Sequence, residues 1–357
     1  MLWFQSCKAE GLVAGRSRCR PKAGCGKVRS KFGAIAVALP GMPASAEAAL
    51  ATGPPQGNDG MAVQSALGKR EKEKSMKLIR YGSPGQEKPG LIDAQGRLCD
   101  LSGVISDIGP GQLGDAALEA LRRLAAAGLP VVEGSPRLGS PLTGVGKFIA
   151  IGLNYADHAA ESGLPIPAEP IVFMKATSCI QGPNDPVMLP RDSVKTDWEV
   201  ELGVVIGTRA RYVLEADALN HVAGYCTVND LSEREYQIER GGTWDKGKGC
   251  DTFGPLGPWL VTRDELADPQ QLAMWLDLNG RRVQSGSTRT MIFSVAKIVS
   301  YVSQFMTLLP GDVITTGTPP GVGMGMKPPV FLKEGDRMAL GIEGLGEQHQ
   351  VVVGFKP

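Results

Sequence analysis

The chain has 357 residues, 42% of them hydrophobic, and a formal net charge of +1. This length is sufficient for one large hydrophobic core and a smaller second unit. The near-zero charge argues against nucleic acid as a partner, and the absence of an apolar stretch of roughly 20 residues argues against a membrane. Seven cysteines without a Cys-x-x-Cys pair indicate reduced thiols in a cytoplasmic protein, not disulfides or a zinc site.

The first 75 residues differ in composition from the rest. They hold twelve Lys/Arg against five Asp/Glu and show no sustained strand or helix periodicity. We expect residues 1–75 to be a disordered basic extension. A targeting segment and a mis-assigned start are alternatives, because Met76 opens the sequence Met-Lys-Leu-Ile-Arg-Tyr-Gly, which resembles the beginning of a folded protein.

Residues 76–140 are expected to form a small β-rich N-terminal domain. Short apolar runs predict strands at Lys77 to Tyr81, Pro89 to Ile92 and Arg97 to Asp100. A helix is predicted between Asp115, as its N-cap, and Gly128, because leucines recur there at helical spacing.

Residues 145–355 are expected to form a larger, catalytic domain. Short apolar runs between Gly and Pro predict strands at Lys147 to Ile151, Ile171 to Lys175, Glu199 to Ile206, Val222 to Asn229, Trp259 to Val261, Ala273 to Leu278, Asp312 to Thr316 and Met338 to Ile342. Helices are predicted at Ala156 to Ser162, Ser232 to Arg240 and Val295 to Met306. The strands do not alternate regularly with helices, so the fold class is α+β and mainly β.

Two glutamates, Glu199 and Glu201, lie two residues apart in the apolar run Trp198 to Ile206. Because a strand alternates its faces with period two, both carboxylates point from one face. Two like charges on one face indicate a hard divalent cation such as Mg²⁺ or Mn²⁺, which prefers oxygen ligands. A half-exposed strand with a solvated acidic face is the alternative that this segment leaves open.

A histidine and a glutamate, His158 and Glu161, follow the first strand of the large domain. On a helix this spacing places both on one face, where Glu161 can orient the imidazole and make His158 a general base for water. An exposed surface pair is the alternative. The other two histidines suit the role less, since His221 lies in an apolar context and His349 in the polar end of the chain.

Three further segments carry candidate functional groups. Asp230 follows a predicted strand and offers a third carboxylate, or else caps the next helix. Lys248 lies among glycines, where it can stabilise an oxyanion or is only solvated. The turn from Thr315 to Gly323 lacks the Gly-Lys-Ser/Thr ending of a phosphate loop, but its amides and the Thr318 hydroxyl can hold a carboxylate; a purely structural turn is the alternative.

The order and the amino-acid sequences of these segments resemble those of the fumarylacetoacetate hydrolase family. The resemblance rests on the blocks Gly-Leu-Asn-Tyr-Ala-Asp-His-x-x-Glu, Trp-Glu-Val-Glu-Leu, Asn-Asp, Lys-Gly-x-Asp-Thr-x-x-Pro, Ser-Gly-x-Thr and Thr-Gly-Thr-Pro-x-Gly-Val-Gly. It implies a homodimer with a mixed β-roll catalytic domain and a small β-rich N-terminal domain. It also implies that Glu199, Glu201 and Asp230 hold Mg²⁺ or Mn²⁺.

The resemblance further assigns roles to the other candidates. It implies that His158 and Glu161 activate water on a mobile lid and that Lys248 stabilises an enolate. Substrate contacts are implied for Thr318 in the segment with Gly317 and, less securely, for Gln237. Asp157 matches an additional carboxylate near the metal in some family members.

The implied reaction is hydrolysis of a C–C bond in a small β-diketo acid, an acylpyruvate or a 2,4-diketo-3-deoxy sugar acid, to pyruvate and a carboxylic acid. Short segments such as Gly241 to Trp244 and Met324 to Pro329 resemble the branch with ureidoglycolate lyases and 2,4-diketo-3-deoxy-L-fuconate or rhamnonate hydrolases. Ureidoglycolate lyase, oxaloacetate decarboxylase and oxo-dienoate isomerase remain alternatives on the same fold. A non-catalytic metal- or ligand-binding module is the alternative outside enzymes.

Overall fold

The computed structural model describes residues 76–357, apart from the side chains of residues 126 and 127. The predictions for residues 1–75, a disordered extension, a targeting segment or a mis-assigned start, lie outside the described residues. Within residues 76–357 no helix has both the length and the apolar character that a membrane crossing requires.

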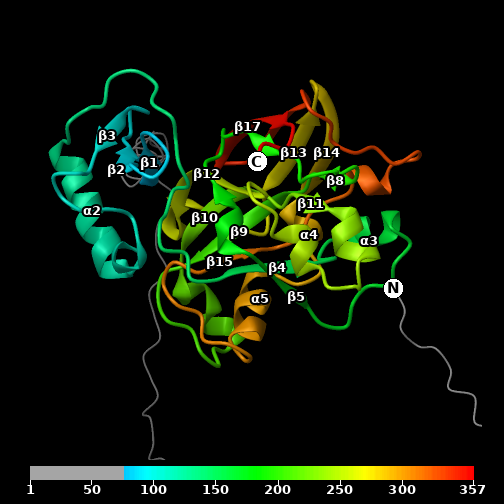
Figure 1. Ribbon diagram of the computed structural model, residues 1–357. Coiled ribbons are helices and arrows are strands. Elements are labelled where there is room, and N and C mark those ends of the chain that lie inside the picture. The colour runs from blue at the N-terminus through cyan, green and yellow to red at the C-terminus, as the bar shows by residue number, and fades with distance from the viewer. Residues whose placement is uncertain (1–75) are drawn as a thin grey trace, which may run out of the picture. The chain divides into compact units, whose positions relative to one another are not determined.

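A ten-stranded mixed sheet forms the centre of the described fold (Figure 1). Its order is β3 (Leu98–Asp100), β2 (Lys88–Ile92), β1 (Lys77–Tyr81), β12 (Gly254–Thr262), β10 (Val222–Asn229), β9 (Val200–Ile206), β15 (Val313–Thr315), β4 (Phe148–Gly152) and β5 (Ile171–Lys175), with β6 (Ile180–Gln181) beside β12. Every predicted strand that lies in this sheet is present, with ends shifted by a few residues. The predicted class, α+β and mainly β, is confirmed.

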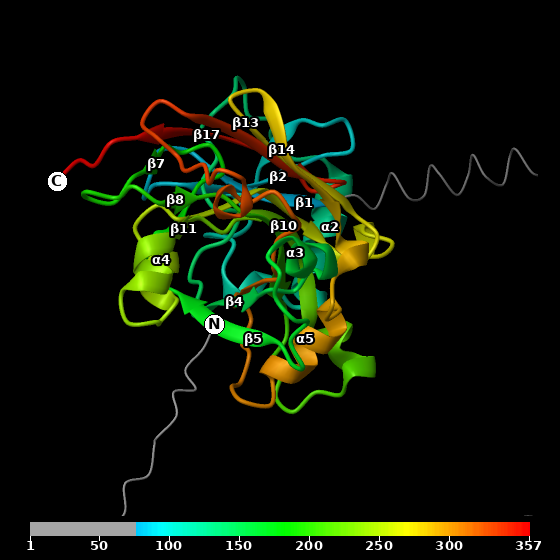
Figure 2. The ribbon, with the colours of Figure 1, turned by 90° about the vertical axis from the view of Figure 1, so that its right-hand side faces the viewer.

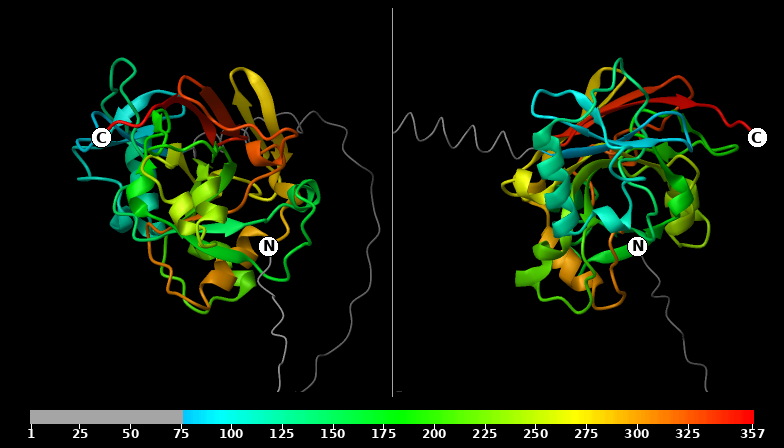
Figure 3. Two further views of the ribbon diagram at one scale, coloured as in Figure 1. Left: turned by 45° about the vertical axis from the view of Figure 1, so that its right-hand side comes forward. Right: turned by 90° about the vertical axis from the view of Figure 1, so that its left-hand side faces the viewer.

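The N-terminal strands belong to this same sheet. β1 pairs antiparallel with β12, so that Leu78 faces Leu260 across the ladder. Both views of Figure 3 show the red C-terminal strand β17 (Gly346–Val353) beside these blue and cyan strands. The pairing of β1 with β12 connects residues 76–100 to the rest of the described chain through backbone hydrogen bonds as well as side-chain packing.

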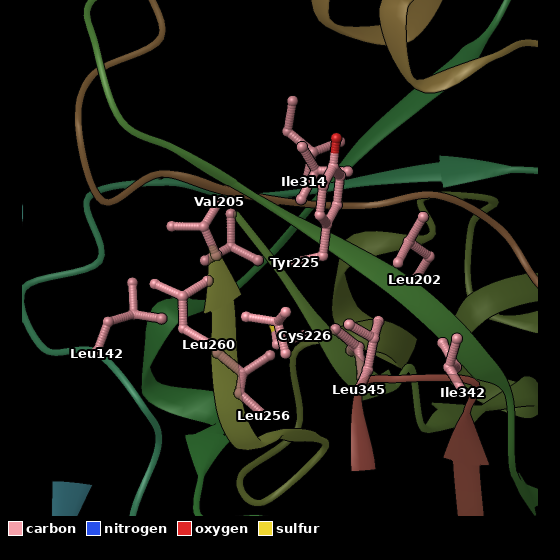
Figure 4. Packing of buried hydrophobic residues seen from close by; sticks show 14 of the residues in the cluster. Leu142, Leu202, Val205, Tyr225, Cys226, Leu256, Leu260, Ile314, Ile342 and Leu345 are labelled. Carbon is pink, nitrogen blue, oxygen red and sulfur yellow. The ribbon is translucent and has the colours of Figure 1, made fainter. Parts of the chain in front are cut away.

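A five-stranded sheet covers the central one (Figure 2). Its order is β14 (Arg281–Ser287), β13 (Ala273–Leu278), β16 (Arg337–Ile342), β17 and β7 (Val187–Met188), and a separate two-stranded pair joins β8 (Thr196–Asp197) to β11 (Ser232–Glu233). Buried Leu202, Cys226 and Leu256 of the central sheet pack near Ile342 of the second sheet and near Leu345, which lies between β16 and β17 (Figure 4). The hydrophobic core therefore lies largely between the two sheets.

Helices are few and short. The α-helices are α2 (Asp115–Ala127), α3 (Ala156–Glu161), α4 (Asp245–Lys248) and α5 (Val295–Val302). The 3-10 segments are η1 (Pro110–Gln112), η2 (Thr177–Cys179), η3 (Glu215–His221), η5 (Arg263–Glu265), η6 (Thr288–Thr290) and η7 (Gly323–Gly325), and η4 (Glu235–Glu239) is a π-helix.

Two expectations about helices are wrong. Gly114 is the N-cap of α2, and Asp115 is instead its first helical residue. The segment predicted as a helix from Ser232 to Arg240 begins as strand β11 and only then forms η4. Ser232 pairs with Asp197 in the β8–β11 ladder, so tertiary pairing overrides the local helical pattern there.

Candidate active site

Three carboxylates meet at the ends of two central strands. Glu199 lies just before β9, Glu201 lies within it, and Asp230 directly follows β10. The antiparallel ladder pairs Glu201 with Val228, and the Asp230 N–H donates to the Glu199 carbonyl at 2.8 Å. Ligand oxygens of the three side chains lie within 4.8 Å of one another, and the residues are only 6%, 2% and 1% exposed. The alternative of a solvated acidic face is wrong, because β9 is covered on both faces.

Three cations surround this carboxylate cluster. Lys248 Nζ donates to Glu199 Oε2 at 2.6 Å and to Asp230 Oδ2 at 2.8 Å. Arg234 Nη2 donates to Glu199 Oε1 at 2.7 Å, and Lys175 Nζ donates to Asp230 Oδ1 at 2.6 Å. Each of these ion pairs is almost fully buried, where an unpaired charge would be costly.

Glu201 has a different environment from its neighbours. Within residues 76–357 it forms no ion pair; its Oε2 accepts the Thr315 hydroxyl at 2.5 Å and the Gly317 N–H at 2.7 Å. Burial, together with the nearby carboxylates of Asp230 and Glu199, raises the pKa of Glu201 well above its usual value. Burial would also raise the pKa of Glu199, but Lys248 and Arg234 outweigh it and hold that pKa at about 2. The cluster therefore favours one more positive charge beside Glu201.

This donor set fits a hard divalent cation. All three side chains offer carboxylate oxygens, the ligands that Mg²⁺ and Mn²⁺ prefer, and they converge from a rigid part of the sheet. Asp197 adds a fourth buried carboxylate against Arg234, so the surroundings hold four carboxylates and three cations. A divalent ion would change this excess of one negative charge to an excess of one positive charge, which suits an anionic ligand.

The lysine reaches the cluster through a close backbone approach. A Cβ at Gly247 would lie 2.5 Å from Gln237 N and from Glu233 O, so glycine allows α4 to pack directly against η4. On η4, Gln237 Oε1 accepts from Arg234 Nη1 at 3.0 Å. Among the described residues Gln237 Nε2 has no hydrogen-bond partner, which leaves it free to donate to a ligand at the edge of the cluster.

The turn from Thr315 to Gly323 was expected to hold a carboxylate through its amides and the Thr318 hydroxyl, but this hydroxyl is hydrogen-bonded within the protein. The Thr318 hydroxyl donates to the Val200 carbonyl at 2.9 Å and accepts from Gln284 Nε2 at 2.9 Å. Its proton is therefore already used inside the protein. Gly317, by contrast, contacts the Glu201 carboxylate directly through its N–H.

The predicted histidine pair is formed on α3. His158 Nδ1 lies 3.0 Å from Glu161 Oε2, and the side chains are 13% and 27% exposed. Glu161 also accepts from the Gly321 N–H at 3.1 Å, which connects the pair to the same loop that contacts Glu201. Asp157 accepts from the Thr290 hydroxyl at 3.1 Å and makes no contact with the three carboxylates.

Three charged residues at this site were not identified from the sequence: Lys175, Asp197 and Arg234. Lys175 ends the apolar run Ile-Val-Phe-Met, and a single charge at the end of a buried strand is a usable signal. Arg234 stands in the polar run Ser-Glu-Arg-Glu, which resembles a solvated surface. Asp197 lies two residues before Glu199 and continues the period-two pattern of the glutamate pair, so this spacing was a usable signal.

The fold and the buried carboxylate site are those of the fumarylacetoacetate hydrolase family. Residues 147–353 match the family model described as fumarylacetoacetate (FAA) hydrolase C-terminal, which is more than half of the chain. The chain therefore belongs to this family, whose members are enzymes.

Similar proteins include both hydrolases and isomerases. A Burkholderia multivorans protein, named only as a hydrolase, is 65% identical over 277 residues, which are 77% of this chain and 98% of the relative. The structure of fumarylacetoacetate hydrolase from Exiguobacterium antarcticum is 37% identical, with a TM-score of 0.69 over 79% of this chain and 100% of that one.

Two further solved structures extend the range of reactions. Maleylpyruvate hydrolase from Sphingobium sp. SYK-6, in complex with manganese(II) and pyruvate, is 30% identical with a TM-score of 0.66, over 79% of this chain and 100% of that one. A 5-carboxymethyl-2-hydroxymuconate delta-isomerase from Mycobacterium smegmatis is 33% identical with a TM-score of 0.62, over the same shares. Hydrolase and isomerase reactions thus occur on this fold.

Proposed function

We propose that the protein is a divalent-metal-dependent hydrolase that cleaves a C–C bond in a small β-diketo acid to give pyruvate and a carboxylic acid. The substrate class is an acylpyruvate or a 2,4-diketo-3-deoxy sugar acid. The observation that carries the proposal is Glu201, a buried carboxylate without an ion-pair partner in the described part of the chain, beside Glu199 and Asp230. The similarity to a maleylpyruvate hydrolase bound to manganese and pyruvate supports the same class of reaction.

Glu199, Glu201 and Asp230 would hold Mg²⁺ or Mn²⁺. When bound, the ion supplies Lewis acidity that polarises an oxo-acid oxygen.

We include the homodimer in the proposal, and light scattering of the purified protein tests it.

His158 and Glu161 handle the proton of the attacking water. An Nδ1–H that donates to Glu161 leaves His158 Nε2 as an acceptor for that proton, and the carboxylate stabilises the resulting imidazolium. The Gly321 N–H holds Glu161 in place for this role. A direct histidine–carboxylate contact serves hydrolysis, in which water must be deprotonated.

Lys248 and Gln237 bind the negatively charged parts of the substrate. Lys248 is buried, and its ammonium remains charged because Asp230 and Glu199 raise its pKa despite the opposing effect of burial. This ammonium lies where enolate charge develops after C–C cleavage. The free Nε2 of Gln237 donates to a substrate oxygen, and Arg234 orients that amide.

A substrate panel tests the proposed function. Acylpyruvates, 2,4-diketo-3-deoxy sugar acids, oxaloacetate, oxo-dienoates and ureidoglycolate are each incubated with the protein, with Mn²⁺ and with a chelator. We expect Mn²⁺-dependent release of pyruvate together with a carboxylic acid. Turnover of an oxo-dienoate without any cleavage would establish the isomerase, which the similarity to the delta-isomerase favours as second candidate. Turnover of ureidoglycolate alone would overturn both.

A further inference from the structure

A buried aspartate outside the metal ligands links the carboxylate cluster to the loop that holds Glu161. Asp197 is fully buried, and β8–β11 pairing sets it beside Arg234. Its Oδ2 accepts from Arg234 Nε at 2.9 Å and from Nη2 at 2.8 Å. The same Nη2 donates to Glu199 Oε1 at 2.7 Å. Asp197 therefore holds the guanidinium that contacts the metal-site carboxylate.

The other contacts of Asp197 lead to the loop. Its Oδ1 accepts from the Gly323 N–H at 2.6 Å, and its Oδ2 accepts from the Met324 N–H at 3.0 Å. Two residues earlier in the chain, the Gly321 N–H donates to Glu161. A charged acceptor that binds two successive amides fixes the path of this backbone, and with it the direction of the Gly321 N–H.

We propose that Asp197 is a positioning residue for the reaction: it holds Arg234 against Glu199 and fixes the 321–324 backbone so that Glu161 orients His158. Asp197 itself does not touch the reacting groups. The catalytic meaning of this role rests on the proposed function, but the structural coupling from Asp197 to His158 does not. It can therefore be measured without any substrate.

The test follows the imidazole of His158 by nitrogen NMR. The chain has three histidines, so selectively labelled protein gives few signals. In the parent protein we expect the proton on Nδ1 of His158, because Glu161 Oε2 lies 3.0 Å from that nitrogen. In Asp197→Asn the neutral amide cannot replace a carboxylate that accepts from Arg234, Gly323 and Met324. We therefore expect the His158 signals to shift toward those of Glu161→Gln. The signals of His221 and His349 should stay unchanged.

Hydrogen exchange gives a second readout of the same coupling. We expect backbone amides of residues 156–161 and 321–324 to exchange at least about tenfold faster in Asp197→Asn, with strand 200–206 unchanged. In the double variant Asp197→Asn/Glu161→Gln, the amides of residues 156–161 should exchange no faster than in the single variants. Additive effects, or equal acceleration in strand 200–206, would overturn the positioning role.

Asp185→Asn is the matched control. Asp185 also accepts from an arginine, Arg137 Nε at 2.6 Å, and from a glycine amide, Gly182 N at 2.9 Å, but it lies outside this cluster. This variant should leave the His158 signals and the exchange of residues 156–161 as in the parent. An equal shift in this control would show that the effect is not specific to Asp197.

Met324→Pro decides the question if Asp197→Asn does not fold. This change removes one of the two loop N–H groups that donate to Asp197 and leaves the Gly323 N–H in place. Met324 has an exposed side chain and lies in the first turn of η7, where proline is tolerated. We expect the same direction of shift at His158 and faster exchange at residues 321–324. An unchanged His158 signal in this folded variant would overturn the proposal.

Discussion

The backbone N–H of Gly317 donates to Glu201 Oε2 at 2.7 Å. Gly317 has a φ of +92°, and a Cβ added there would lie 2.8 Å from Asn154 Cβ. Asn154 in turn donates to the Thr316 carbonyl at 2.8 Å. The direction of the Glu201 carboxylate is therefore fixed by a backbone conformation that only glycine adopts without strain.

Gly317→Ala should weaken Mn²⁺ binding by about tenfold or more and lower the free energy of unfolding by about 1–3 kcal/mol, because it combines backbone strain with a clash. Calorimetric titration with Mn²⁺ and urea unfolding measure the two effects. Gly280→Ala is the control: it has a φ of +79° and no atom within 4 Å of an added Cβ. Gly280→Ala should bind Mn²⁺ like the parent, and an equal loss there would contradict the role of Gly317.

Glu201 should give the metal-free protein an unusual pH dependence. Because burial and the neighbouring carboxylates raise its pKa, the folded protein holds this proton more tightly than the unfolded chain. The contribution of Glu201 to stability is thus fully present below its ordinary value of 4.5 and is lost as pH rises through the raised pKa. In chelator, the unfolding midpoint should decrease as the pH is raised above 4.5, while the stabilisation by Mn²⁺ should increase.

Glu201→Gln checks this assignment. The amide oxygen can still accept from Thr315 and Gly317, but the side chain no longer titrates. We expect a flatter dependence of the unfolding midpoint on pH in chelator and no stabilisation by Mn²⁺. An unchanged slope would assign the pH dependence to another group.

His158→Gln should lower kcat by about 10²- to 10⁴-fold, the usual contribution of a general base, on whichever substrate the parent hydrolyses. Mn²⁺ binding should be unaffected, because His158 contacts Glu161 and none of the three carboxylates. His349→Gln is the matched control, since the His349 side chain is 63% exposed and pairs with Glu347, away from the three carboxylates. Unchanged turnover in His158→Gln would remove the histidine from the mechanism.

Thr318→Val should reduce stability more than it affects substrate binding. The Thr318 hydroxyl donates to the Val200 carbonyl and accepts from Gln284, and removing it leaves both buried groups without this partner. We expect a loss of about 1–3 kcal/mol in the free energy of unfolding, with Thr318→Ser close to the parent. A stable Thr318→Val protein with a KM raised by about tenfold would instead place the hydroxyl on the substrate.

The site was predictable where local periodicity and chemistry coincide. Glu199 and Glu201 were recognisable because two carboxylates on one face of an apolar strand require positive charge close by. The contacts of Lys175 and Arg234 were not, since each depends on which strands become neighbours. Lys175 meets Asp230 across 55 residues of sequence, and no local pattern specifies that separation.

The fold was predictable to a similar extent. Strands with apolar runs were found, whereas β14 and β17 were missed because their buried positions include glutamines. Gln284 donates to the Pro319 carbonyl, and Gln348 donates to the Thr227 carbonyl, so both amides are satisfied inside the core. A polar residue whose hydrogen bonds come from distant loops looks like a surface residue in the sequence.

The contacts of the loop of residues 317–324 limit how much the length of this loop can change between related enzymes. Its amides bind the carboxylates of Glu201, Glu161 and Asp197 in succession. One inserted residue would move later amides by about 3.8 Å, more than a hydrogen bond can stretch. The loop length is therefore not free to vary, and a change of substrate size has to come from side chains or from segments such as 162–170, where insertions disturb no such contact.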